Sequence, residues 1–292
     1  MFESLFLTFL LVTPTSILAL VPFIDGGKGI PKLYDGWMNG QIAKQARTAV
    51  SKAIQSGKTK IEVNFPAVPN VEEAKFGTPL NQKFGVNTVA KELGVPGGYR
   101  PGSEVSRQLI AFSNMYWAKE LAPAVSGSLV GGKRVSVLSA EQVVFKQITK
   151  PGVDFMGSLS SRGQRGDASI QKGDALIAVN PGGEETWDRI YSLYGSPSAP
   201  MVVLNNAYST TYGLGNKRGY EEAYYLKRIS KGWIFRQYPG NWEAYLEKPD
   251  FTLELLASYK EKPELNKVAA VVREESFKRY AFDNDRWLSG RL

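Results

Sequence analysis

The sequence predicts an α/β fold in which a mainly parallel sheet is flanked by helices and extended by a C-terminal antiparallel meander. Two observations predict this class. Residues 174–206 show a buried strand, a tight turn, an amphipathic helix and a second buried strand, the pattern of a right-handed βαβ unit. Between residues 222 and 257, short alternating runs are separated by tight turns, which is typical of antiparallel strands joined by hairpins.

The first part of the chain contains an apolar segment and a linker. Residues 1–23 are apolar apart from Glu3 and a polar interruption, so the segment has the length of a membrane anchor and also fits a cleaved targeting signal. The first positive charges, Lys28 and Lys32, follow it, and the positive-inside bias then keeps the body on the cytoplasmic or stromal side. Residues 24–34 are rich in glycine and proline and are predicted to be a linker.

Residues 35–276 are predicted to form one α/β domain. Apolar residues at helical spacing and short apolar runs predict, in chain order, a helix at 40–56, a strand at 60–65, a short helix at 87–93, a helix at 103–121 and a strand at 134–138. The glycine, serine and arginine content of residues 150–172 indicates a mobile surface insertion. After the βαβ unit and the meander, a helix at 264–276 precedes a charged, aromatic tail at 277–292.

The composition excludes several classes of site. The chain has no cysteine and no histidine, so it has no disulfides, no thiolate or histidine metal site and no Ser-His-Asp triad. We therefore predict no cofactor and no metal, and an enzymatic role is disfavoured without being excluded. The formal net charge of +8 is spread along the chain, whereas nucleic-acid binding needs a continuous basic stripe, so no nucleic-acid partner is expected.

Four asparagines follow strands that we place in the parallel layer: Asn64, Asn180, Asn205 and Asn206. The carboxyl ends of parallel strands border the crevice in which open α/β sheets bind ligands, so these residues are a candidate binding site. Asparagine is also a good turn residue, because its side chain bonds local backbone and tolerates left-handed geometry. Both interpretations remain open. The turn after Asn180 lacks the G-x-G-x-x-G spacing of a dinucleotide loop.

The stretch FRQYPGNW, residues 235–242, is the densest cluster of aromatic and polar groups in the chain. It is predicted to be a hairpin whose Pro-Gly turn aligns Phe235, Tyr238 and Trp242 for cross-strand packing. Phe235 and Trp242 are expected in the core. Arg236 and Tyr238 are the candidate contacts for a partner, with Arg236 exposed, so that its loss would weaken association and leave stability unchanged.

The order of the motifs IEVNFP (61–66), AVNP (178–181), VLNN (203–206) and FRQYPGNW resembles an uncharacterised plastid domain family. That family occurs in the Low Photosystem II Accumulation type of assembly protein and as an extension of a plastid adenylate kinase. The resemblance covers roughly residues 32–259, and FRQYPGNW is its most specific part. The family usually has Asn-Pro where this chain has Asn205-Asn206. The resemblance implies a plastid setting and a link to photosystem biogenesis, and it implies no catalytic residues.

The resemblance implies a non-catalytic plastid protein that assists assembly or stability of a photosynthetic complex. The expected partners are that complex and the thylakoid membrane surface, and the expected location is the stromal side of the thylakoid membrane or the stroma. The alternative is a small-molecule or nucleotide-handling α/β domain that uses the crevice at the carboxyl ends of the strands.

Overall fold

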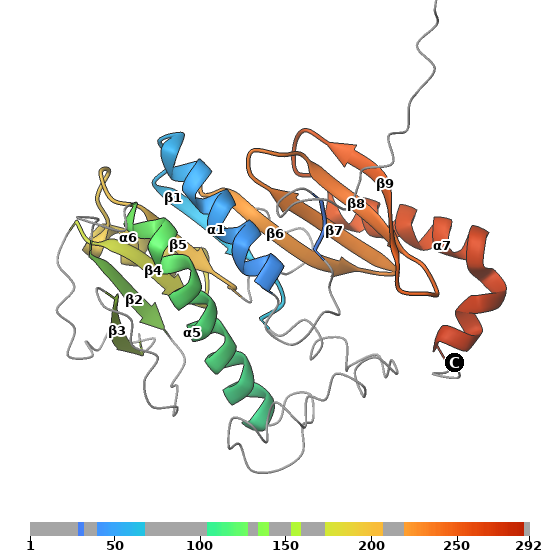
Figure 1. Cartoon of the computed structure of the whole chain (residues 1–292), viewed down its shortest axis with the longest axis horizontal. Helices are drawn as coiled ribbons and strands as arrows, with labels where there is room; N and C mark the ends of the chain where they lie inside the picture. The colour runs from blue at the N-terminus through green and yellow to red at the C-terminus, as the bar shows by residue number, and fades with distance from the viewer. Residues whose placement is uncertain are drawn as a thin grey trace, which may run out of the picture.

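The structure is a computed structural model, and it describes residues 29–31, 40–67, 104–127, 134–139, 153–158, 173–206 and 219–288. The strands among these residues form one nine-stranded sheet in the order β3-β2-β4-β5-β1-β6-β7-β8-β9 (Figure 1). Their bounds are β1 Lys60–Asn64, β2 Val135–Ser139, β3 Val153–Ser158, β4 Ala175–Val179, β5 Met201–Leu204, β6 Glu221–Ile229, β7 Gly232–Gln237, β8 Trp242–Glu247 and β9 Leu253–Tyr259. The helices are α1 Gly40–Gln55, α5 Glu104–Ser126, α6 Glu184–Tyr194 and α7 Leu265–Leu288.

The sheet has a parallel half and an antiparallel half. Strands β3, β2, β4, β5, β1 and β6 pair in parallel, whereas β6, β7, β8 and β9 form an antiparallel meander. The predicted fold class is therefore confirmed. Strand β6 joins the two halves, because it pairs in parallel with β1 on one side and antiparallel with β7 on the other.

Helices cover both faces of the sheet. Successive residues of β4 alternate between two core clusters: Ala175, Ile177 and Val179 face α1 and α5, while Leu176 and Ala178 face α6. This alternation is the period of two that a strand imposes on its side chains. On the antiparallel half, α7 covers the same side of the sheet as α6 and packs against β6, β7 and β8 (Figure 1).

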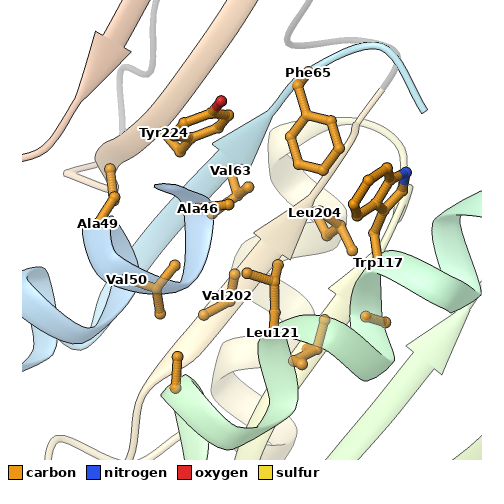
Figure 2. Packing of buried hydrophobic residues seen from close by; sticks show 14 of the residues in the cluster. Ala46, Ala49, Val50, Val63, Phe65, Trp117, Leu121, Val202, Leu204 and Tyr224 are labelled. Carbon is orange, nitrogen blue, oxygen red and sulfur yellow. The ribbon is translucent and has the colours of Figure 1, made fainter. Parts of the chain in front are cut away.

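A chain of aromatic rings crosses the face covered by α1 and α5 (Figure 2). Phe65 meets Trp117 edge-to-face at 5.1 Å between ring centroids and meets Tyr224 at 5.7 Å, and Tyr224 meets Phe235 at 5.7 Å. The indole Nε1 of Trp117 donates a hydrogen bond to the carbonyl of Ala67 at 2.7 Å. Edge-to-face pairs stabilise beyond their area burial, so these rings fasten α5 to strands of both halves of the sheet.

Three elements differ from the sequence prediction. Residues 150–172 were predicted to be a surface insertion, yet Val153–Ser158 forms β3, the strand at one edge of the sheet. Helix α5 continues past the predicted end to Ser126, with Pro123 inside it. Helix α7 runs to Leu288, with a non-helical residue at Tyr280, so the predicted tail is helical as far as residue 288.

The predicted short helix at 87–93 and the apolar segment at 1–23 lie outside the described residues. No helix in the described ranges combines the length and the apolarity that crossing a membrane requires.

Candidate functional site

Three strands that end in asparagine are neighbours in the sheet. The order β4-β5-β1 places the carboxyl ends of these three parallel strands side by side, so Asn180, Asn205, Asn206 and Asn64 lie along one edge of the parallel half. The prediction that these residues share one edge is confirmed. Whether the edge can bind a ligand depends on what their side chains contact.

Asn205 fastens the end of β5 to β1 and to α5. Its backbone φ is 46°, the left-handed geometry that asparagine tolerates, and its N–H donates to the carbonyl of Val63 at 2.8 Å. Its side-chain Oδ1 accepts the N–H of Phe65 at 2.9 Å, and its Nδ2 donates to Oδ1 of Asn114 at 2.9 Å. Both atoms of the amide are therefore engaged within the chain.

Asn206 holds the turn between β4 and α6. Its Nδ2 donates to the carbonyl of Gly182 at 2.7 Å, and its Oδ1 accepts the N–H of the same residue at 3.0 Å. The indole of Trp187 also donates to the Gly182 carbonyl, at 3.0 Å. Asn180 begins this turn with a φ of 43° and donates its N–H to Leu204. Asn180 and Asn205 thus have the left-handed dihedrals of turn residues, and the side chains of Asn205 and Asn206 bond the backbone of neighbouring segments.

Asn64 differs from the other asparagines. It is 2% exposed, and its Nδ2 donates to Oε1 of Glu62 at 2.6 Å. Its Oδ1 is buried and has no hydrogen-bond partner. A buried acceptor without a donor costs about 1–3 kcal/mol, so this oxygen could accept a hydrogen bond from an additional donor.

The sequence analysis missed two buried carboxylates beside Asn64. Glu62 on β1 and Glu222 on β6 are in register and are 1% and 7% exposed. Carboxylates at directly opposite positions repel each other, and Lys262 offsets this by forming an ion pair with Glu222. The predicted topology could have indicated this burial. A strand in the middle of a parallel sheet is covered on both faces, so the polar positions of the alternating run at 60–65 are buried as well.

The turn of the FRQYPGNW hairpin lies at the opposite end of the strands from the four asparagines. Strand β7 runs antiparallel to β6, so its end at Gln237 and the turn that follows point towards the beginning of β6. Tyr238 donates its N–H to the carbonyl of Ala223 near that beginning, at 2.8 Å. The structure therefore brings the asparagines together at the strand ends and places Arg236 two strands from Asn64 in the same row of the sheet, because Tyr225 pairs with both residues.

Arg236 is partly buried and holds β7 to the start of β6, contrary to the prediction that it is exposed. Its side chain is 15% exposed, and its guanidinium pairs with Oε1 of Glu221 at 2.8 Å. It also donates to the carbonyl of Glu222 at 2.8 Å, and it lies 5.3 Å from the ring centroid of Trp242. A guanidinium presents several donors in a fixed fork, which lets one side chain fasten β7 to the start of β6.

The aromatic residues of the hairpin belong to two different cores. Phe235 is 2% exposed on the α1 side of the sheet, and Trp242 is 2% exposed under α7. Their predicted burial is confirmed, but the predicted cross-strand packing between them is wrong, because Trp242 pairs in register with Arg236 and Phe235 pairs with Glu243. Tyr238 is half-buried against the α1-side core.

Two buried tyrosines on the sheet have pKa values shifted by their surroundings. Burial raises the pKa of Tyr224 well above its usual value, and its hydroxyl donates to Oε1 of Gln45 at 2.9 Å. Burial, reinforced by the Glu243 carboxylate, also raises the pKa of Tyr245. Within the described ranges, no three acidic side chains gather as a metal site would need.

A family model described as "Domain of unknown function (DUF1995)" matches residues 39–270, and the chain belongs to this family. The match covers the whole sheet, from α1 to the first turns of α7. A search of the curated proteins and a search of the solved structures found no match to the chain.

Proposed function

We propose that this member of the DUF1995 family is a non-catalytic plastid protein that assists assembly or stability of a photosynthetic complex at the thylakoid. The proposal rests on the hydrogen bonds that the asparagine side chains make at the carboxyl ends of β4, β5 and β1. The amides of Asn205 and Asn206 bond the chain's own backbone and Asn114, so the crevice position where open α/β sheets bind ligands is occupied by structural contacts.

The motifs that link the chain to plastid assembly proteins support the setting. Their order along the chain resembles that of the Low Photosystem II Accumulation type, and each motif lies on an element of the sheet. In the proposal the sheet domain lies on the stromal side of the thylakoid membrane and binds the photosynthetic complex there. Residues 1–23, when they are retained, attach the domain to the membrane.

Co-purification tests the proposal. A chain tagged after residue 292 is expressed in its own plastids, the thylakoids are solubilised, and co-purifying proteins are identified by mass spectrometry. We expect subunits of one photosynthetic complex to be enriched over a tagged control that lacks residues 29–288. Enrichment of none of these subunits, with the tagged chain intact, would overturn the proposal.

One observation favours the alternative of a small-molecule or nucleotide-handling domain. Asn64 Oδ1 is a buried acceptor without a partner beside the Glu62 carboxylate, and a bound molecule with a hydrogen-bond donor would satisfy it. A ligand that binds the folded chain at 100 times its dissociation constant stabilises it by about 2.7 kcal/mol. A thermal-shift screen with nucleotides and small amines therefore separates the functions: a stabilisation that Asn64→Leu abolishes would support the alternative.

A further inference from the structure

Residues 29–31 form a strap across the antiparallel half of the sheet, on the side covered by α1. The carbonyl of Gly29 accepts a hydrogen bond from Nε2 of Gln45 at 2.8 Å. The backbone of Ile30 hydrogen-bonds the hydroxyl of Tyr245, its side chain packs on the core, and Pro31 is buried. Figure 1 shows the strap as a short dark-blue stretch beside β7. The strap belongs to the folded domain, although the predicted linker includes it.

The groups that hold the strap are themselves fixed. Gln45 is fully buried, and its Oε1 accepts the hydroxyl of Tyr224 while its Nε2 bonds the strap. Tyr245 is 8% exposed, and its hydroxyl donates to Oε2 of Glu243 at 2.6 Å. Because these side chains have defined partners, the chain enters the domain at one defined place beside β8.

A large exposed apolar side chain lies next to this entry point. Leu255 on β9 is directly opposite Tyr245 in the antiparallel register, and directly opposite side chains share a face of the sheet. Leu255 is 51% exposed, whereas Leu253 on the same strand is partly buried against the core. Strand β9 is last in the order of the described strands, so this face lies at the border of the sheet.

We infer that the face of β9 that carries Leu255 lies against the lipid bilayer. The inference rests on the proposed function, in which residues 1–23 are embedded in the membrane. Six peptide units separate Phe23 from Gly29, and a fully extended chain of that length spans at most ~22 Å. Gly29 therefore stays within that distance of the membrane, and the β8–β9 border that the strap contacts lies next to it, with Leu255 as the exposed apolar side chain there.

Single-cysteine labelling tests the inference, because the chain has no cysteine of its own. Leu255→Cys carries a fluorophore at the proposed contact. Leu193→Cys is the matched control, since Leu193 is 53% exposed but lies on α6, which covers the opposite face of the parallel half. The full chain is reconstituted into vesicles of phosphatidylcholine and phosphatidylglycerol, and melting curves verify that both labelled variants fold.

We expect lipid-attached quenchers to quench the label at position 255 several-fold more than the label at position 193. Iodide in the buffer should instead quench the label at position 193 more strongly. Equal quenching of the two labels in a chain that floats with the vesicles would overturn the inference and leave the proposed membrane association standing. Protection of Leu255 from both quenchers would overturn it in favour of a protein contact. A chain that does not float would overturn both the inference and the membrane part of the proposed function.

Discussion

Replacing Arg236 with alanine removes the clamp between β7 and the start of β6. The variant loses an ion pair to Glu221 at 2.8 Å and a hydrogen bond to the Glu222 carbonyl at 2.8 Å. Hydrogen bonds that involve a charged group contribute about 1.5–3 kcal/mol each, and Glu221 keeps a second cation, Lys58, at 3.4 Å. We therefore expect the free energy of unfolding to fall by about 2–3 kcal/mol.

A loss of that size is measurable by thermal melting. For a domain of 150–250 residues, each kcal/mol shifts Tm by roughly 2–4 °C, so Arg236→Ala should melt about 4–12 °C lower. Arg279→Ala is the matched control, because Arg279 also pairs with two carboxylates, Glu254 and Glu275, but its side chain is 37% exposed. Exposed ion pairs contribute little, so this variant should melt close to the parent chain.

Arg236→Lys sharpens the test, because lysine keeps the positive charge and loses the fork that bonds Glu221 and the Glu222 carbonyl together. We expect an intermediate Tm. If Arg236→Ala melts at the temperature of the parent chain, the contacts of the guanidinium do not stabilise the fold, and the expected loss of stability is refuted. That result would also return Arg236 to the role that the sequence predicts, a group available to a partner.

Two further predictions follow from buried polar groups. Asn206→Ala should lower the free energy of unfolding in urea by about 2 kcal/mol, because the N–H of Gly182 loses its side-chain acceptor and the Gly182 carbonyl keeps only the indole of Trp187. Unchanged or increased stability would instead favour a ligand role for Asn206. Burial raises the pKa of Tyr224 in the folded chain, so Tyr224 should stay protonated at pH values at which an unfolded tyrosine ionises. Its contribution to stability should therefore be fully present below pH ~10 and should be lost as the pH rises through the folded pKa. Phenolate absorbance measures this: the parent chain should show one late-ionising tyrosine more than Tyr224→Phe, and equal titration curves would contradict the expectation.

The sequence predicted the sheet best where the local pattern is strong. The apolar runs of β4 and β5 with the helix between them, and the alternating runs of β6 to β9, each carry their own periodicity. Strand β3 was missed because glycine, serine and arginine surround it and it pairs only with β2 among the described strands. The extension of α7 was missed because charged and aromatic residues show no apolar period, although arginine, lysine and glutamate favour helices.

The sequence was sufficient to predict where the candidate site lies, but it could not predict which residues the side chains of the site contact. Parallel strands place their carboxyl ends together, so the clustering of the asparagines follows from topology. The partner of Asn205 is Asn114, which is 91 residues away in the sequence, and no local pattern specifies such a contact. The burial of Arg236 was missed for a related reason. Alternation gives the face of the sheet on which a side chain lies, and the depth of burial depends on which helix covers that face.

These contacts change what the shared motifs imply. The residues of these motifs that the structure describes in most detail fasten the sheet: Asn205 and Asn206 hold strand ends, Arg236 clamps two strands, and Phe235 and Trp242 fill two cores. A sequence that shares these motifs therefore shares the means of building this sheet. Binding to a partner depends on exposed residues instead, and Leu255, which lies outside every one of these motifs, is such a residue. Chains with the same motifs can accordingly carry different exposed surfaces on one scaffold.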